Sequence, residues 1–210
     1  MGTGKKVKYT GLVDQSVHKT VSELRTYRRR NESGNLAACF DVDETLLFWR
    51  SNSSEGSTSV NTEMFVAHLS LLKHNQAAIV INYQIFIITA RPKTDAGLAY
   101  LVKQLRKLNY DLHAIPPGGI YMMNREYYDD TTRINGSSTG TFKSSARDHI
   151  QKKYNVQIIA MVGDQWSDVF KNGDNEEFLD THNLSGQTSY IIRNADENVK
   201  IGLKLPDVHD

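Results

Sequence analysis

Residues 36–47 read Leu-Ala-Ala-Cys-Phe-Asp-Val-Asp-Glu-Thr-Leu-Leu, a short apolar run that ends in two carboxylates. A continuous apolar run of this length is typical of a central strand that is covered on both faces of a sheet. Because the apolar run stops at Asp41, a turn can follow it and bring the side chains of Asp41 and Asp43 to one reacting centre. The stretch therefore predicts a buried strand over 36–40 with a pair of acidic side chains at its carboxyl end.

Similar apolar runs alternate along the chain with segments of helical periodicity, an order that is typical of a parallel α/β sheet. Further strands are predicted over 84–88, 119–123, 158–162 and 189–192, and helices over 15–30, from about 62, around 98–105 and around 146–150. Asp14 is expected to cap the first helix, which would place the arginines at 28–30 in its last turn. In the helix from 62, we expect Phe65, Leu69 and Leu72 to face inward.

The length and composition suit one domain. The chain has 210 residues, 39% of them apolar, which is enough for one hydrophobic core. We expect residues 1–35 to form a basic helix that packs on the core, and residues 36–210 to form the main domain, with a short cap loop at 46–61 and a polar loop at 125–142. Residues 1–30 hold eight Lys and Arg against two acids, and the chain from 164 onward holds ten acids against four bases. Partner binding and solvated faces both explain such an uneven charge.

Cysteine usage and hydropathy exclude several classes of protein. Cys39 is the only cysteine, so neither an intrachain disulfide nor a cysteine-based metal site can form. No apolar stretch approaches the roughly 18–20 residues that a transmembrane helix needs. The first residues lack the hydrophobic segment of a secretory signal. These observations predict a soluble, cytoplasmic protein, although a processed or recombinant start would hide a targeting segment.

Polar residues follow two more of the predicted strands. Thr89 comes directly after the apolar run at 85–88, and Asp164 follows the run that ends in Gly163. In open α/β sheets, ligands bind at the carboxyl ends of the strands. The sequence therefore predicts that Asp41, Thr89 and Asp164 meet at one edge of the sheet.

The carboxylate pair Asp41 and Asp43, together with Thr89 and Arg91, carries groups that suit phosphoryl transfer. One carboxylate of the pair can attack phosphorus to give an aspartyl-phosphate, and the other can act as general acid and base. The same Asp-x-Asp-x-Thr spacing also occurs in turns and calcium loops. The Thr89 hydroxyl and the next backbone N–H could bind a phosphoryl oxygen, and Arg91 could add a bidentate contact. A helix cap is the alternative role of Thr89.

The remaining candidates are a lysine and a second acidic motif. Lys143 lies just before a predicted helix, where its ammonium could offset the charge of an aspartyl-phosphate, although a lone lysine there is usually a surface residue. Asp164, Asp41 and a backbone carbonyl of the first motif are hard oxygen ligands of the kind that Mg²⁺ binds. Asp168, one helical turn after Asp164, could orient a metal-bound water or Lys143. Trp166 could stack on a substrate or fill a gap in the packing.

Taken together and in this order, the motifs resemble those of the haloacid dehalogenase-like (HAD) phosphatases over about residues 36–192. They are Asp41-x-Asp43-x-Thr45, Thr89, Lys143 and Gly163-Asp164-x-x-x-Asp168. The stretches at 40–47 and 163–168 resemble the acid phosphatase subfamily IIIB, which includes plant acid phosphatases and vegetative storage proteins.

The resemblance implies a Rossmann-like three-layer sandwich with a central parallel sheet of about five strands, a Mg²⁺ cofactor and a phosphoaspartate intermediate. The roles that it implies are nucleophile and metal ligand for Asp41, acid/base and carbonyl metal ligand for Asp43, phosphate binding for Thr89, Arg91 and Lys143, metal binding for Asp164, and support of the metal site for Asp168. The expected function is therefore Mg²⁺-dependent hydrolysis of a phosphomonoester. A nucleotide or polynucleotide phosphatase, a phosphotransferase, and a non-catalytic storage or binding protein are the alternatives.

The segment 46–61 is too short to hold the large cap domain that the superfamily often inserts there. An uncapped site would suit a bulky or macromolecular phosphoester, or a second subunit that closes the cleft. The polar loop at 125–142 is expected to form a partial lid.

Overall fold

The computed structural model describes residues 3–30, 34–48, 59–73, 83–123, 137–169, 178–184, 187–193 and 200–206. Its helices are α1 (Thr3–Arg30), α2 (Thr62–Lys73), α3 (Asp95–Lys107), α4 (Ser137–Tyr154) and α5 (Trp166–Val169), with a short 3-10 helix at Leu112–Ala114. Its strands are β1 (Leu36–Phe40), β2 (Leu47–Phe48), β3 (Ser59–Val60), β4 (Gln84–Pro92), β5 (Ile120–Met123), β6 (Gln157–Gly163), β7 (Phe178–Leu184), β8 (Gln187–Arg193) and β9 (Ile201–Lys204). None of the helices in these ranges is both long and apolar enough to cross a membrane.

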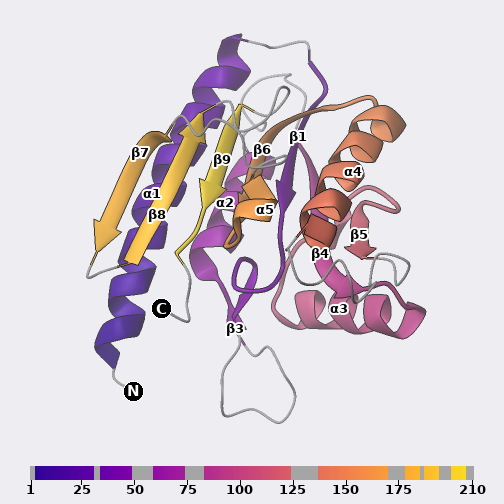
Figure 1. Ribbon diagram of the computed structural model, residues 1–210, viewed down its shortest axis with the longest axis horizontal. Coiled ribbons are helices and arrows are strands. Elements are labelled where there is room, and N and C mark those ends of the chain that lie inside the picture. The colour runs from indigo at the N-terminus through magenta and orange to yellow at the C-terminus, as the bar shows by residue number, and fades with distance from the viewer. Residues whose placement is uncertain are drawn as a thin grey trace.

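The main sheet has the order β5-β4-β1-β6-β9-β8-β7 (Figure 1). The neighbouring strands β5, β4, β1, β6 and β9 pair in parallel. The strands β8 and β7 extend the sheet beyond β9 in antiparallel pairs. The predicted α/β class and mostly parallel sheet are confirmed. The described part of the sheet has seven strands rather than about five, because β7 and β9 were not foreseen and the predicted strand at 189–192 belongs to the antiparallel extension.

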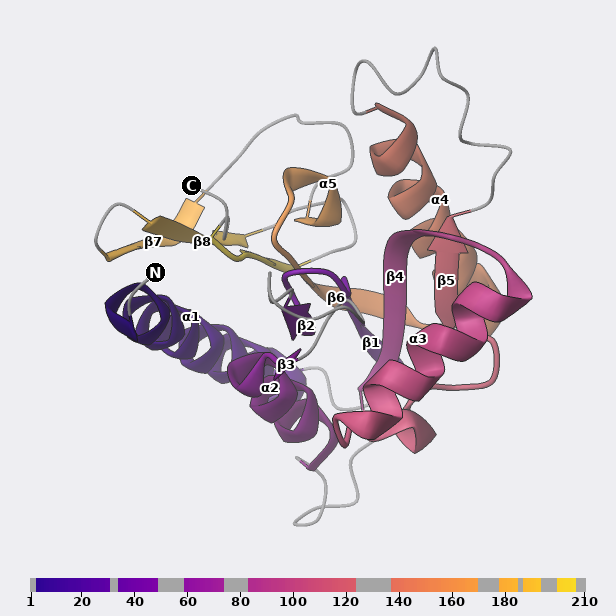
Figure 2. The ribbon, with the colours of Figure 1, turned by 90° about the horizontal axis from the view of Figure 1, so that it is seen from below.

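Helices cover both faces of the sheet, which confirms the three-layer sandwich. Seen from below, α1, α2 and α3 lie on one face, and α4 and α5 lie on the other (Figure 2). The chain runs from β1 through α2 to β4 and through α3 to β5, and then returns across the sheet through α4 to β6. Since parallel crossovers are right-handed, the reversal of direction after β5 puts α4 on the opposite face.

The burial of β1 explains its sequence. Leu36, Ala38 and Phe40 face the core beneath α1, α2 and α3, whereas Ala37 and Cys39 face the core beneath α4. Side chains alternate along a strand, so a strand that is covered on both faces needs an apolar residue at every position. Fully burying a side chain such as Phe40 stabilises the fold by about 1.5–3 kcal/mol. Cys39 is a packed thiol, and burial raises its pKa to about 12.

Two predictions about the helices on the first face were wrong in detail. The helix α1 begins at Thr3 rather than near residue 15, so Asp14 lies inside it and is not its cap. The stretch before Asp14 holds no proline, and the glycines in it lower helix propensity without breaking the helix. The helix α2 begins at Thr62 as predicted, but its buried side chains include Met64 and Leu71. The residues that were expected to face inward are only partly buried, so the buried stripe is shifted by one position.

The two expected loops are only partly within the described residues. In the segment 46–61, β2 and β3 form a short antiparallel pair, and residues 49–58 lie outside the described ranges. The polar segment 125–142 is not a loop throughout, because α4 already begins at Ser137. Its Ser, Thr and Gly residues have low helix propensity, which concealed the helix. Residues 124–136, on which the expected lid depends, lie outside the described ranges.

Candidate active site

Asp41 and Asp164 follow neighbouring strands at the same edge of the sheet. Asp41 comes directly after β1, and its backbone N–H donates to the carbonyl of Val162 in β6 at 2.9 Å. Asp164 comes directly after β6. Because β1 and β6 are parallel neighbours, their carboxyl ends bring the two acidic side chains together, as the sequence predicts.

Thr89 lies inside a strand rather than at its end. The strand β4 continues to Pro92, with a shift in its register against β5 after Thr89. The buried Thr89 hydroxyl accepts a hydrogen bond from the backbone N–H of Arg91 at 3.3 Å. The helix α3 is capped instead by Thr94, whose side chain accepts from Gly97 N–H, so the helix-cap alternative for Thr89 was wrong.

Lys143 is buried against the two carboxylates that its predicted role requires. Its Nζ donates to Oδ1 of Asp41 at 2.9 Å and also to Oδ1 of Asp168. The side chains of Lys143 and Asp41 are only 4% and 7% exposed. The helix α4 therefore carries a cation from the far face of the sheet to the end of β1, across 102 residues of sequence.

Three carboxylates converge beside this lysine. Oxygen atoms of Asp41, Asp164 and Asp168 all lie within 4.8 Å of one another. Lys143 pairs with two of these three buried carboxylates, Asp41 and Asp168, so an excess of negative charge is left that a divalent cation would offset. Carboxylate oxygens are the ligands that Mg²⁺ prefers, so the donor set fits this ion.

Burial and neighbouring charges shift the pKa values of Asp41, Asp164 and Lys143. Burial raises the pKa of Asp41 well above its usual range, and the neighbouring charge of Asp168 raises it further, against the effect of Lys143. Burial also raises the pKa of Asp164 to about 6, with a smaller contribution from Asp168. For Lys143, burial lowers the pKa, but the charges of Asp41 and Asp168 outweigh this effect and raise it. Lys143 therefore stays protonated.

Gly163 allows Asp168 to reach the cluster. A Cβ at residue 163 would lie 2.2 Å from both Cβ and Oδ2 of Asp168, a distance that no side chain could keep. The Oδ2 atom of Asp168 also accepts from the backbone N–H of Gln165 at 2.9 Å. The glycine and this turn together fix the carboxylate that holds Lys143.

Arg147 is a second buried cation that sequence reasoning missed. It lies one helical turn after Lys143 on α4, and its Nη1 donates to the carbonyls of Ser167 and Asp168 at 3.4 and 3.5 Å. The spacing of four residues from Lys143 places both cations on one face of the helix and is the signal that could have found it. Arg147 thus joins α4 to the segment that carries Asp168.

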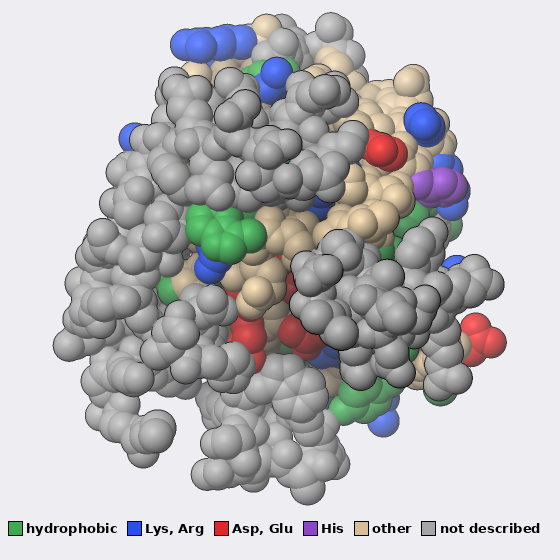
Figure 3. Space-filling model, in the orientation of Figure 1, with side chains coloured by type: hydrophobic (Ala, Val, Ile, Leu, Met, Phe, Trp, Pro, Cys, Tyr) green, Lys and Arg blue, Asp and Glu red, His purple; other side chains and the backbone are tan. Residues whose placement is uncertain are grey.

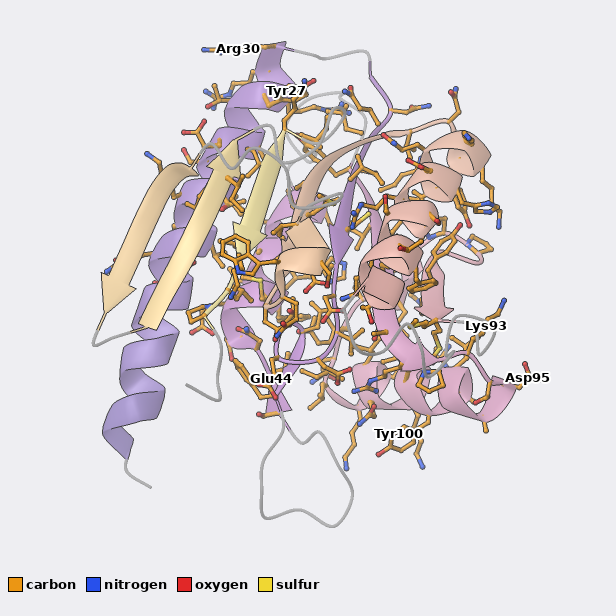
Figure 4. All side chains as sticks on the ribbon, viewed as in Figure 1. Tyr27, Arg30, Glu44, Lys93, Asp95 and Tyr100 are labelled. Atoms are coloured by element: carbon orange, nitrogen blue, oxygen red, sulfur yellow. The ribbon has the colours of Figure 1, made fainter. Side chains whose placement is uncertain are left out.

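A tight turn follows Asp41 and contains Asp43. The carbonyl of Val42 accepts from the N–H groups of Thr45, Leu46 and Leu47, and the backbone of Glu44 is left-handed, with φ of 54°. Figure 4 labels Glu44 in this loop, beyond the end of β1.

Asp43 pairs with Arg91. The Nε of Arg91 donates to both carboxylate oxygens of Asp43, at 3.2 and 2.9 Å, and its Nη2 donates to Oδ1 at 2.5 Å. The remaining terminal nitrogen, Nη1, donates to Oε1 of Gln104 at 2.7 Å. Sequence reasoning also missed Gln104, whose place on an amphipathic helix gave no signal of its partner.

The rim of the site is visible on the surface. In Figure 3, acidic side chains gather near the middle of the face, in the region where β1 and β6 end in Figure 1. Trp166 is exposed beside Asp164, and the Nζ of Lys204 lies 5.4 Å from its ring centroid. Trp166 therefore packs on a cation, and its suggested stacking on a substrate stays a prediction.

Residues 3–195 match the family model described as HAD superfamily, subfamily IIIB (Acid phosphatase), and the chain belongs to this family. The resemblance inferred from the motifs is thereby confirmed. Among solved structures, the class C acid phosphatase from Bacillus anthracis matches with a TM-score of 0.44 at 16% sequence identity, over 80% of this chain and 66% of that one. The chain thus spans slightly less than two thirds of the length of that structure. No curated protein matches the chain.

Proposed function

We propose that the protein is a Mg²⁺-dependent phosphomonoester hydrolase that works through an aspartyl-phosphate on Asp41. The observation that carries this proposal is the contact of 2.9 Å between Asp41 and the buried ammonium of Lys143, within a cluster of three carboxylates. A buried ion pair is costly to form and adds little to stability, so its place at the ligand-binding edge of the sheet favours a catalytic role.

In the first step, an oxygen of Asp41 attacks phosphorus and the ester oxygen leaves with a proton from Asp43. In the second step, Asp43 takes a proton from a water molecule, whose oxygen attacks phosphorus and releases inorganic phosphate and free Asp41. Lys143 offsets the negative charge that grows between the carboxylate and the phosphoryl oxygens, and the hydroxyl of Thr89 is assigned to one of those oxygens.

Asp41 must be ionised to attack, although burial raises its pKa. Lys143 supplies one favourable charge. Mg²⁺, held by the carboxylates of Asp41 and Asp164 and the backbone carbonyl of Asp43, would supply a Lewis acid that favours the ionised carboxylate and polarises the phosphoryl group.

The substrate class beyond a phosphomonoester stays a prediction. A nucleotide or polynucleotide phosphate, a bulky phosphoester and closure of the cleft by a second subunit were suggested by the basic start of the chain and by the short segment 46–61. The non-catalytic alternative is disfavoured by the paired nucleophile and lysine, since a storage protein has no need of that arrangement.

The decisive experiment compares Asp41→Asn with Asp14→Asn, a matched control on the exposed part of α1. With 4-nitrophenyl phosphate and Mg²⁺, Asp41→Asn should lower kcat by at least about 10⁴ while circular dichroism stays unchanged, and the control should keep full activity. Hydroxylamine added during turnover should convert Asp41 of the wild type to a hydroxamate that peptide mass spectrometry detects. Substantial turnover by Asp41→Asn would remove Asp41 from its role. Activity that is unchanged by EDTA would contradict the proposed dependence on Mg²⁺.

A further inference from the structure

Asp43, Arg91 and Gln104 form a chain of hydrogen bonds that leads away from the reacting centre. The side chain of Asp43 is 35% exposed and that of Arg91 is 17% exposed. Gln104 is only 8% exposed and lies on the buried face of α3, together with the fully buried Leu101 and Leu105. The chain therefore begins at the site and ends in the wall of the core.

The guanidinium of Arg91 is held at two sides. It has five N–H donors in one rigid plane, and three of its nitrogens are engaged: Nε and Nη2 by Asp43, and Nη1 by Gln104. A planar group that is bound at two sides cannot rotate without breaking one of the contacts. Gln104 therefore determines the plane in which Arg91 presents its fork to Asp43.

Gln104 is an unusual residue for its position. A buried amide is unfavourable unless it is hydrogen-bonded, and an apolar residue would fit between the packed leucines of α3. The hydrogen bond that its side-chain oxygen accepts comes from Arg91 at 2.7 Å. The helix that carries Gln104 is itself fixed at its start by the Thr94 cap, so this acceptor stands on a rigid element.

We propose that Gln104 is a positioning residue: it fixes Arg91 and, through Arg91, holds the carboxylate of Asp43 in the orientation that proton transfer to the leaving oxygen requires. The inference rests on the proposed function, because it takes Asp43 to be the general acid. Without Gln104, Arg91 pivots on its long side chain, and the carboxylate that it holds moves with it. A displacement of about 1 Å in a reacting group can lower a rate by about 10².

The readout that separates positioning from general damage is the dependence on the leaving group. An alkoxide such as that of glycerol 2-phosphate needs a proton as it leaves, whereas 4-nitrophenolate is stable without one. Misplacing Asp43 therefore slows the hydrolysis of glycerol 2-phosphate far more than the hydrolysis of 4-nitrophenyl phosphate. Damage to the fold or to phosphate binding slows both substrates equally.

The experiment measures the ratio of kcat/KM for the two substrates in Gln104→Met, Gln104→Glu and the control Leu105→Met. Gln104→Met removes the acceptor at similar volume, and the ratio of glycerol 2-phosphate to 4-nitrophenyl phosphate should fall about tenfold. Gln104→Glu keeps an oxygen acceptor and should restore most of the ratio. Leu105→Met alters the same buried face of α3 without touching Arg91, and it should leave the ratio unchanged. An unchanged ratio in Gln104→Met, or an equal fall on both substrates, would overturn the proposal.

A double-mutant cycle tests whether Gln104 acts through Arg91. In the background of Arg91→Met, the further change Gln104→Met should not alter the ratio again, and an additive effect would contradict the proposal. Asp43→Asn separates this inference from the proposed function. If Asp43→Asn changes the ratio and Gln104→Met does not, only the role of Gln104 fails. If Asp43→Asn also leaves the ratio unchanged, the acid role of Asp43 fails.

Discussion

Asp41 and Asp43 are two residues apart in sequence but lie in very different surroundings. Asp41 is buried against Lys143 among other carboxylates, whereas Asp43 is partly exposed and paired with Arg91. Asp41 directly follows β1, whereas Asp43 lies in the tight turn in which the carbonyl of Val42 accepts from three later N–H groups. Under the proposed function, the same residue type takes two roles in these two surroundings, Asp41 as nucleophile and Asp43 as acid.

The two ion pairs also differ in what holds them. The cation of the buried pair comes from α4 and is shared with Asp168, so the charge balance of the cluster depends on it. The cation of the partly exposed pair is fixed by a neutral amide, Gln104. Losing the first cation should affect the reaction on every substrate, and losing the second should affect mainly those with poor leaving groups.

Replacing Lys143 should have the largest effect. Lys143→Met leaves Asp41 and Asp168 without their cation, and kcat should fall by about 10³ or more on both good and poor leaving groups. Steady-state kinetics with saturating Mg²⁺ measures this fall in kcat. Lys103→Met, at an exposed position of α3, is the control and should be fully active. If kcat of Lys143→Met fell only with poor leaving groups, the Asp41–Lys143 pair would not differ in its effect from the Asp43–Arg91 pair.

Gly163→Ala should have the next largest effect, again on the buried side. The added Cβ would lie 2.2 Å from Asp168, so Asp168 must move and Lys143 loses one of its two carboxylate partners. A fall in kcat of about 10² is expected on both substrates. Gly140→Ala is the matched control, since the nearest atom to its Cβ, on Ser167, is at an ordinary 3.9 Å. Equal activities of the two variants would mean that the position of Asp168 does not matter.

Asp43→Asn should have a smaller and more selective effect. The amide cannot donate or take the proton, so kcat/KM for glycerol 2-phosphate should fall by about 10², with a much weaker effect on the first step with 4-nitrophenyl phosphate. Single-turnover kinetics isolates that first step. Asp95→Asn, at the exposed start of α3, is the control. A uniform loss on both substrates would make Asp43 resemble Asp41 and would remove the contrast between them.

His68 should affect stability and leave the reaction unchanged. It lies between the rings of Phe40 and Tyr110, and neither of its ring nitrogens has a hydrogen-bond partner among the described residues. Burial lowers its pKa to about 4, against a smaller opposing effect of Asp111. In the unfolded chain His68 is protonated as the pH falls below about 6.5, whereas in the folded protein it stays neutral down to about pH 4. The free energy of unfolding should therefore decrease by about 3 kcal/mol as the pH is lowered through this window.

His68→Phe removes this titration and keeps a ring in the stack. Urea unfolding at pH 7 and at pH 4.5 should show a smaller loss of stability on acidification than in the wild type, with kcat at pH 7 unchanged. The same pH dependence in both proteins would mean that His68 is not the source of the acid sensitivity.

Much of this arrangement was predictable because the parallel strands are buried on both faces. β1 and β6 appear as continuous apolar runs, and Asp41 and Asp164 stand directly after them. The strands at the antiparallel end gave weaker signals. The strand β7 mixes polar and apolar residues, and β9 is a run of only four residues that contains a glycine.

The pairing of Asp43 could not be predicted. Asp43 lies in a tight turn that includes the left-handed backbone of Glu44, and the sequence has no glycine or asparagine there to indicate such a turn. Its partner Arg91 is 48 residues away, and the support of Gln104 becomes visible only once α3 is packed on the sheet. Local pattern finds residues at strand ends, whereas contacts between side chains of different elements require the tertiary structure.

The contact between Asp41 and Lys143 closes a span of 102 residues, and this has a consequence for synthesis of the chain. A growing polypeptide contains Asp41 long before the ribosome has made Lys143. Under the proposed function, a nascent fragment that ends before residue 143 cannot hydrolyse a phosphomonoester, so activity requires this long-range contact to form.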